Sequence, residues 1–474
     1  MNKENNEETL GVSPEELSRV ICAWNISPED IMKPKNKVSR RGFMKSTGMA
    51  VVGGSVVAGR PVSGAAGKRQ DSELIIREYR TLGRTGFDIS DISFGTGNLN
   101  NANVMQVALD MGVNYIDTAE HYVNGQAERS VGEALKGRDR SKIFITTKLN
   151  LQFGGSTKAE IRQRFFRCLE RLQTDYVDCL MMHAVPNVEQ IKHDAFHSTF
   201  QELKAEGKVR FLGLSNHGQE QSWWGQMDVP MEDIIGAAAE DGRFDVALFV
   251  YNFLQKEQGE KIIQMCRSSD MGVTLMKTDP INLYAGIRDN ISRTESSGRQ
   301  VSEARRQLAQ QYESFIARAD EFKQQYGISS ESDARAAATR YVLDNSGVHT
   351  VCATINTFDV LEAFVMLSGE KLTADEDLLL KGYESTLGNY YCRHACGICE
   401  PSCPNQVPVN TIMRFNHYFE AQGREKHAMQ KFASLTETSV DSCIDCQGHC
   451  ESACPYEVPV RSLLANAYHN LTLE

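Results

Sequence analysis

The sequence predicts an α/β fold in which eight strand–helix units close into a (β/α)8 TIM barrel, followed by a small α-rich domain. Between Tyr79 and Gly369, short apolar runs alternate with amphipathic helical stretches. Near-continuous apolar strands separated by helices indicate a parallel sheet that is buried on both faces. A doubly wound open sheet is the alternative. It is disfavoured because no G-x-G-x-x-G motif follows the early strands.

The strands are predicted in chain order. The first lies near DISDISFGTG, and the other seven are NYIDTA, KIFITTK, VDCLMMH, VRFLGLSN, VALFVYN, GVTLMK and HTVCATI. Between them, segments such as AEIRQRFFRCLERLQT have apolar residues at three- and four-residue spacing, as helices do. Residues 281–334 are extra length, and their periodicity predicts a partly helical insertion, either a lid near the barrel mouth or a solvated decoration.

Residues 1–70 are interpreted as a leader. Arg40 and Arg41 precede thirteen small and apolar residues, whereas a membrane span needs about twenty. The pattern SRRGFMK resembles the twin-arginine signal, which directs folded and often cofactor-loaded proteins across a membrane. An arginine pair ahead of an ordinary Gly/Ala-rich linker is the alternative. We expect an exported protein, located in the periplasm or cell envelope.

The distribution of cysteines divides the rest of the chain into two predicted domains. The net charge of −11 gives no electrostatic reason to expect nucleic-acid binding, and no segment after the leader is apolar enough to span a membrane, so none is expected in the mature chain. Eight of the thirteen cysteines lie in residues 392–474. We therefore predict a barrel domain over residues 75–385 and a separate cysteine-rich domain over residues 386–474.

Ionisable side chains follow three consecutive predicted strands. Asp117 lies within NYIDTA and Tyr122 follows it, Lys148 ends the next strand, and His183 ends the one after it. Each alone has an ordinary interpretation, as a helix N-cap, a packing aromatic, a surface lysine or a core histidine. Together they place a carboxylate, a phenol, an ammonium and an imidazole at the end of the barrel where chemistry occurs.

At these positions the chain resembles the aldo-keto reductase family, along the whole barrel. YRTLGRTGFDISDISFGTG, RLQTDYVDCLMMH, LKAEGKVRFLGLSN and YNFLQ follow the order of that family's segments. The resemblance implies that Tyr122 is a general acid toward a carbonyl oxygen, and that Lys148 lowers its pKa from the ordinary value of about 10. The implied site residues are a tetrad of Asp117, Tyr122, Lys148 and His183, and a carboxamide-binding pair, Ser215 and Asn216.

One departure from the family concerns the cofactor. In the family, the last strand leads into a Gly-x-Arg/Lys stretch whose cation holds the 2′-phosphate of NADPH. Here Ala353 and Ile355 occupy the glycine and basic positions. NADP(H) or NAD(H) is the implied cofactor. We expect weak NADPH binding with little preference over NADH, or a nucleotide loaded before export.

The cysteine-rich domain contains an internal duplication. Residues 392–404 read CRHACGICEPSCP and residues 443–455 read CIDCQGHCESACP, and their Cys-Pro ends, CPNQVPV and CPYEVPV, align at an offset of 51 residues. Such runs closed by Cys-Pro resemble the bacterial ferredoxin run, whose thiolates hold [4Fe–4S] clusters. Each run here is one residue longer. Zinc sites and disulfides are the alternatives.

The ferredoxin resemblance implies two [4Fe–4S] clusters in which the fourth cysteine of each run serves the other cluster. One cluster would take Cys392, Cys396, Cys399 and Cys454, and the other Cys443, Cys446, Cys450 and Cys403. Because such clusters are built inside the cell, the protein would be folded before it leaves, in agreement with the predicted signal.

The predicted function is therefore that of an exported oxidoreductase. Its substrate would be a small carbonyl or alcohol compound, and the clusters would exchange electrons with a redox partner protein. The alternative is an electron-transfer or binding module whose barrel is not catalytic.

Overall fold

The computed structural model describes residues 74–99, 101–152, 156–217, 221–222, 225–226, 229–283, 295–296, 303–394, 396–420, 424–435, 443 and 446–472. These residues belong to one compact unit. The predicted leader, with Arg40 and Arg41, lies outside the described residues. Within the described ranges, the search for a helix long and apolar enough to cross a membrane finds none.

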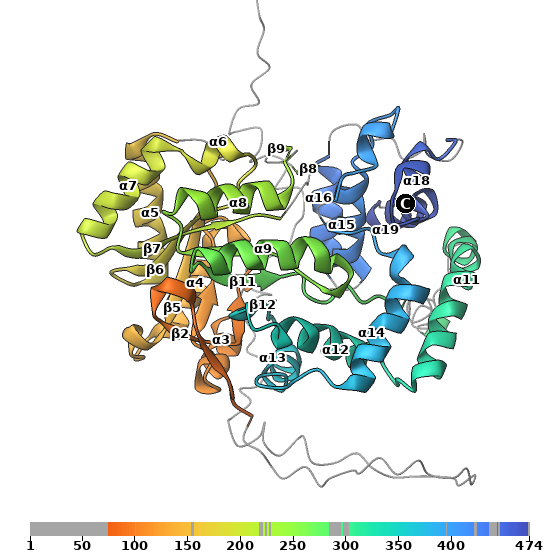
Figure 1. Cartoon of the computed structure of the whole chain (residues 1–474), viewed down its shortest axis with the longest axis horizontal. Helices are drawn as coiled ribbons and strands as arrows, with labels where there is room; N and C mark the ends of the chain where they lie inside the picture. The colour runs from red at the N-terminus through yellow and green to blue at the C-terminus, as the bar shows by residue number, and fades with distance from the viewer. Residues whose placement is uncertain are drawn as a thin grey trace, which may run out of the picture. The chain divides into compact units, whose positions relative to one another are not determined.

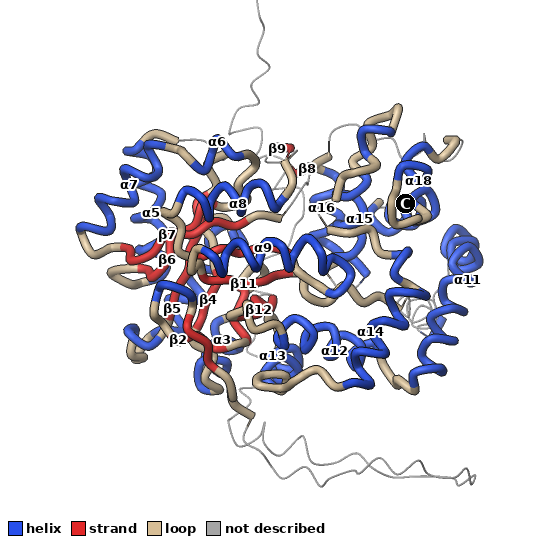
Figure 2. The backbone as a smooth tube through the Cα atoms, in the orientation of Figure 1, coloured by secondary structure: helices blue, strands red, loops and turns tan. Residues whose placement is uncertain are grey.

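Eight parallel strands close into a barrel, which confirms the predicted (β/α)8 architecture (Figure 2). Closure occurs between the last and the first strand, where Ala353 pairs with Phe94. Every residue of the third and fourth barrel strands is buried, as expected for a sheet covered on both faces. The barrel strands are β3 (Ile92–Gly95), β4 (Tyr115–Asp117), β5 (Phe144–Leu149), β6 (Val177–Met182), β7 (Val209–Ser215), β10 (Val246–Val250), β11 (Gly272–Met276) and β12 (Thr350–Thr354).

Helices surround the strands (Figure 1). The helix after β5 shows why: its buried residues include Ile161, Phe165 and Cys168, at helical spacing. Thr157 and Glu160 form a capping box that starts this helix. The helices of this layer are α3 (Ala102–Asp110), α4 (Gln126–Leu135), α5 (Lys158–Leu172), α6 (Val188–Ile191), α7 (Asp194–Ala205), α8 (Met231–Asp241), α9 (Lys256–Ser268), α12 (Glu331–Asp344), α13 (Phe358–Val365) and α14 (Ala374–Thr386).

The segment predicted as the first strand divides in two. Its first part is β2 (Asp88–Ser90), which pairs antiparallel with β1 (Tyr79–Thr81), and its second part is β3 of the barrel. Asp91 separates them. Its buried carboxylate accepts hydrogen bonds from Ser368 Oγ at 2.7 Å and from Gly369 N at 2.8 Å. Because a buried carboxylate needs such partners, these bonds fix the position of Asp91 between the two strands.

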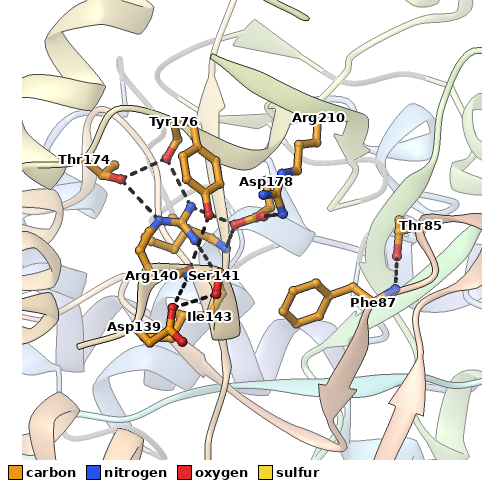
Figure 3. A network of polar contacts seen from close by, with 11 residues as sticks. Thr85, Phe87, Asp139, Arg140, Ser141, Ile143, Thr174, Tyr176, Asp178 and Arg210 are labelled. Atoms are coloured by element: carbon orange, nitrogen blue, oxygen red, sulfur yellow. Dashed lines mark hydrogen bonds and ion pairs between the residues drawn. The ribbon is translucent and has the colours of Figure 1, made fainter. Parts of the chain in front are cut away.

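The amino-terminal end of the barrel is fixed by a polar network (Figure 3). Asp178, on β6, accepts hydrogen bonds from Ile145 N at 2.9 Å, Arg140 Nη2 at 2.7 Å and Arg210 Nη1 at 3.0 Å. These donors come from β5, from the segment before it and from β7. The network therefore ties three neighbouring strands at the end opposite to the catalytic end of such barrels.

A second hydrophobic core joins the insertion to the cysteine-rich region. Phe322 of α11 (Glu303–Tyr326) lies in the same buried cluster as Tyr383 of α14 and Phe415 of α15. Helix α11 packs on α14, and α15 packs on α16 and α19. The helices of the C-terminal region are α15 (Val409–Glu420), α16 (Glu425–Ala433), α18 (His449–Ala453) and α19 (Val460–Leu471).

The two cysteine segments repeat the same backbone contacts. Glu400 Oε1 accepts a hydrogen bond from Asn410 N at 2.8 Å, and Glu451 Oε1 accepts one from Arg461 N at 2.9 Å. These pairs are related by the predicted offset of 51 residues. Each contact joins a Cys-Pro turn to the first turn of the helix that follows it, α15 or α19. The duplication is thus present in the fold as well as in the sequence.

The remaining described elements are short. They are β8 (Gln221–Ser222), β9 (Gly225–Gln226) and the 3-10 helices η2 (Gly83–Thr85), η3 (Tyr122–Gly125), η4 (Arg140–Lys142), η5 (Phe253–Gln255), η6 (Gly388–Tyr390) and η7 (Glu400–Ser402).

Candidate functional site

A buried ion pair lies at the carboxyl ends of β4 and β5. Lys148 Nζ contacts Asp117 Oδ1 and donates a hydrogen bond to Thr118 O at 2.9 Å. The lysine side chain is fully buried. Burial alone would lower the pKa of Lys148, but the Asp117 carboxylate raises it above the ordinary value. The pair therefore keeps a cation in the barrel mouth.

Tyr122 begins η3, directly after the loop that follows β4. Lys148 Nζ lies 5.0 Å from the centroid of its ring. Burial raises the pKa of Tyr122 to about 12, because the opposing effect of Lys148 is smaller. The expectation that Lys148 brings this pKa below its ordinary value is therefore wrong in net direction. At neutral pH the side chain is a phenol, which donates a proton.

Two imidazoles stand beside this phenol, and a third lies near one of them. The His183 ring lies edge-on to Tyr122, with centroids 5.7 Å apart, and is stacked on His121 at 4.8 Å. The centroid of the His217 ring lies 6.3 Å from that of His183. Burial, and next the neighbouring His121, lower the pKa of His183 well below the ordinary value. His183 is therefore a neutral imidazole.

Sequence reasoning missed His121 and His217. A signal was available, because His121 directly precedes Tyr122 and His217 directly follows Asn216, the last residue of the predicted carboxamide pair. Both imidazoles thus belong to the strand-end segments that were already singled out.

Ser215 and Asn216 end β7 and are fully buried. Ser215 Oγ accepts a hydrogen bond from Ala184 N at 3.0 Å, and Asn216 Nδ2 donates to Val185 O at 2.7 Å. The pair therefore holds the segment that follows His183. A hydroxyl has one donor and two acceptor positions, so accepting from Ala184 leaves the Ser215 proton for another acceptor.

The segment after β12 is apolar where the family places a cation. Ile355 is only 1% exposed and belongs to the main hydrophobic core. Thr357 caps α13, its Oγ1 accepting from Val360 N at 3.3 Å. The first turn of this helix contains Asp359 and, like the rest of residues 350–365, no lysine or arginine.

The first group of thiols comes from both cysteine runs. Burial, and then the thiols of Cys396 and Cys399, raise the pKa of Cys392. Burial is also the main cause of the raised pKa of Cys399, followed by Glu400 and then by the thiols of Cys450, Cys454 and Cys396. Cys454 also raises the pKa of Cys396. Cys399 therefore has thiol neighbours in both of the ligand sets that the ferredoxin resemblance implies, Cys454 in its own set and Cys450 in the other.

Thiols of the second run also have a neighbour in the first. Burial, and then Cys403, Cys450 and Cys446, raise the pKa of Cys443 to about 11. Burial, then Glu451 and Cys403, raise the pKa of Cys450. Cys403 therefore acts on thiols of the second run, as Cys454 acts on thiols of the first.

Two further findings concern these cysteines. None of the described cysteines is paired in a disulfide. Among the described residues, no group of three or more His, Cys, Asp or Glu side chains is arranged to hold a metal ion. Two backbone or amide donors point at the thiols: Val407 N donates to Cys403 Sγ and Asn410 Nδ2 to Cys392 Sγ, each at 3.4 Å.

A closed parallel barrel with a tyrosine, a lysine and a histidine at neighbouring strand ends defines the class of protein by its fold and by the site at the barrel mouth. The family comparison gives the same result: the model of the Aldo/keto reductase family matches residues 91–377. The chain belongs to the aldo/keto reductase family.

Individual relatives differ in what they are named for. The chain is 34% identical over 149 residues to "Uncharacterized oxidoreductase YqkF" of Bacillus subtilis, covering 29% of this chain and 48% of that protein. It is 36% identical over 186 residues to "Probable voltage-gated potassium channel subunit beta" of Arabidopsis thaliana, covering 36% and 56%. The chain thus spans about half the length of the curated relatives it matches.

Among solved structures, the aldo-keto reductase AKR11C1 from Bacillus halodurans is 23% identical, with a TM-score of 0.47. The match covers 64% of this chain and 95% of that one.

Proposed function

We propose that the protein is an oxidoreductase that interconverts the carbonyl and alcohol forms of a small substrate. The observation that carries the proposal is the meeting of Asp117, Tyr122, Lys148 and His183 at one mouth, from three consecutive strand ends. A buried phenol beside a cation and a neutral imidazole is a proton donor aimed at a substrate oxygen.

Each side chain has a separate task in this proposal. Tyr122 donates its proton to the carbonyl oxygen during reduction and takes it back during oxidation. Lys148, kept charged by Asp117, stabilises the negative charge that develops on Tyr122. His183 orients the carbonyl. A nicotinamide, when bound, supplies or accepts the hydride, and Ser215 and Asn216 would hold its carboxamide.

The test of this proposal is the replacement Tyr122→Phe. Carbonyl reduction should fall by roughly 10²–10⁴-fold, because the proton donor is lost, while binding of the nicotinamide is retained. Lys148→Met should be nearly as damaging. Unchanged turnover in both variants would support the alternative, a binding or electron-transfer module with a non-catalytic barrel. That alternative has one specific observation in its favour, the relative named as a channel subunit.

The pH dependence gives an independent check. Tyr122 has a raised pKa of about 12, so the protonated form that reduction needs is present below that value. Reduction should therefore be nearly constant from about pH 6 to 9, whereas alcohol oxidation, which needs the phenolate, should rise with pH. A reduction rate that falls steeply between these values would contradict the assignment of Tyr122.

The nucleotide is proposed to bind without a strong preference for its 2′-phosphate. Ile355 is buried and Asp359 is negative in the segment where the family has its cation. The missing charge-assisted contact corresponds to about ten- to a hundredfold in affinity. Titration with NADPH and NADH, after a check for co-purified nucleotide, should show weak NADPH binding with little preference over NADH, or a retained nucleotide. Tight, exchangeable binding selective for NADPH would overturn this.

The cysteine groups are proposed to hold two [4Fe–4S] clusters. Support comes from the thiols of the two runs, which act on one another's pKa, and from the donors that face Cys403 and Cys392. Such clusters, when bound, transfer single electrons. Protein purified without oxygen should be brown, with about eight iron atoms per chain and a reducible paramagnetic resonance signal. Stoichiometric zinc without iron would overturn this proposal.

Export is proposed from the twin-arginine pattern alone. A reporter fused to residues 1–70 should leave the cytoplasm only while Arg40 and Arg41 are both present. Export that survives their replacement by lysine would point to the general secretory route. A redox partner protein outside the cytoplasm would then exchange electrons with the clusters.

A further inference from the structure

The segment between the two cysteine runs reaches the barrel mouth. Arg424, at the start of α16, donates a hydrogen bond from Nη2 to Asn98 Oδ1 at 2.5 Å. Asn98 follows β3 at its carboxyl end. Helix α15, which precedes this segment, contacts β8 in the loop after β7 (Figure 1). The C-terminal region therefore contributes side chains to the end of the barrel where Tyr122 lies.

Two guanidinium groups share one aromatic ring there. The Cζ atoms of Arg414 and Arg424 lie 4.6 Å and 4.9 Å from the centroid of the Tyr418 ring. Arg414 is 5% exposed, and its Nε has no hydrogen-bond partner among the described residues. Two like charges held against one ring repel each other, and a bound anion would relieve that repulsion.

Arg424 and Lys431 act electrostatically on the side chains around Tyr122. Burial lowers the pKa of Arg424, and Tyr122 acts on it in the opposite direction. After burial, Lys431 of α16 is among the cations that lower the pKa of His121 and of His217. The charges of Arg424 and Lys431 thus act on the tyrosine and on two of the imidazoles, and Lys431 Nζ lies 5.6 Å from the centroid of the Phe415 ring on α15.

The carboxylates of this region have partners of their own. Asp117 contacts Lys148, and Glu120 contacts Arg164. Asp279 contacts Arg335 on α12, at 2.7 Å, and Arg414 also lowers the pKa of Asp279. Glu420, which lines a cavity together with Arg414, accepts hydrogen bonds from Asn466 and Asn470.

We propose that the substrate is a carbonyl compound bearing a carboxylate, which Arg424 and Lys431 hold while Tyr122 reaches the carbonyl oxygen. This inference rests on the proposed function and specifies its substrate class. Arg414 is a positioning residue in it, because it shares the Tyr418 ring with Arg424. The C-terminal region therefore completes the substrate site as well as carrying the cysteines.

The test compares two aldehydes that differ in one charge, 4-carboxybenzaldehyde and methyl 4-formylbenzoate. The wild-type protein should prefer the acid. Arg424→Gln and Lys431→Gln should each lower kcat/KM for the acid by about ten- to a hundredfold, mainly through KM, and leave the ester nearly unchanged. The matched control is Arg162→Gln, whose guanidinium pairs with Glu206 on the outer helices at 2.8 Å. It should alter neither substrate.

A binding measurement separates this inference from the proposed chemistry. Terephthalate, an unreactive dicarboxylate, should bind to wild-type protein and to Tyr122→Phe with similar affinity. Its affinity for Arg424→Gln should be about tenfold weaker or more. Equal binding of terephthalate to wild-type and Arg424→Gln, with ester reduction intact, would overturn the inference and leave the proposed function standing. If the wild-type protein reduced neither aldehyde but bound terephthalate more tightly than Arg424→Gln does, the proposed function would fall and the anion-binding role of Arg424 would stand.

Discussion

The two cysteine runs have the same backbone frame and different surroundings. Both make the Glu-to-helix contact described above. At the helix positions where the first repeat has Arg414 and His417, the second has Ala465 and Tyr468. Arg414 and His417 line a small cavity of about 50 Å³ next to Cys392, to which Leu463 and Asn466 of the second repeat also contribute. At these two helix positions the first repeat therefore has a cation and an imidazole where the second has a methyl group and a phenol.

Among the described residues, only the first repeat is joined to a barrel loop by a pair of hydrogen bonds between one side chain and the backbone of one residue, which we call the Gln255 clamp. Gln255, at the end of η5, donates from Nε2 to His394 O at 2.7 Å and accepts at Oε1 from His394 N at 3.1 Å. A single side chain thus holds both backbone groups of the residue two positions after Cys392. The comparison indicates that both repeats share the Glu-to-helix frame, while a side chain of the barrel holds the first repeat through its backbone.

The largest expected effect comes from the equivalent cysteines Cys399 and Cys450, which are both buried. Cys399→Ser and Cys450→Ser should each lose about half of the iron. Each should also unfold its part of the C-terminal region, because metal ligation supplies on the order of 10 kcal/mol to small metal-binding domains. Iron analysis and thermal unfolding measure this. Cys266→Ser, in α9, is the control that should keep its iron. Full iron content in either ligand variant would refute the assignment.

Removal of the Gln255 clamp should loosen the first repeat and leave the second unchanged. Gln255→Ala leaves the backbone N–H and C=O of His394 without their partner, at a cost of about 1–3 kcal/mol. Hydrogen exchange should speed up in residues 392–400 and stay unchanged in residues 446–454. Gln258→Ala, which removes a contact to Glu232 on α8, serves as the control. Equal acceleration in both repeats would show that the clamp is not specific to the first.

The shared backbone contact should contribute equally to both repeats. Glu400→Ala and Glu451→Ala each remove an acceptor from a helix-terminal N–H and should each destabilise the protein by about 1 kcal/mol. Glu451 also pairs with Arg461 Nε at 3.0 Å, with both side chains partly exposed, and such surface pairs add little. Chemical denaturation measures both. A cost for Glu451→Ala several times that of Glu400→Ala would contradict the equivalence.

The smallest effect should be a gain in stability. Gln406 and Glu457 occupy equivalent left-handed turns, with φ of 51° and 53°. Replacing either by Gly relieves the backbone strain and should stabilise the folded state. The gain should be only about 0.5 kcal/mol, because Gly loses more conformational entropy on folding than the residue it replaces. Gln430→Gly, at an exposed position inside α16, should instead destabilise by about 1 kcal/mol. A loss of stability in both turn variants would mean that their side chains make compensating contacts.

Periodic sequence patterns were sufficient for the barrel. Continuous apolar runs such as VDCLMMH cannot be accommodated except in a strand covered on both faces, so the eight strands could be predicted. The division of the first strand at Asp91 could not, because it depends on Ser368 and Gly369, which are distant in sequence. The tetrad positions followed from strand ends, whereas His121 and His217 were recognised only when their rings met His183.

The sequence by itself determined which chemical groups are present and at what spacing, including the duplicated cysteine runs, since spacing is a local property of the chain. Tertiary structure decided how those groups behave. Burial outweighs Lys148 and raises the pKa of Tyr122, and no pattern in the sequence gives the depth at which a side chain is buried. The approach of Arg424 to the barrel mouth was likewise decided by packing, because Asn98, its partner, lies more than three hundred residues earlier in the chain.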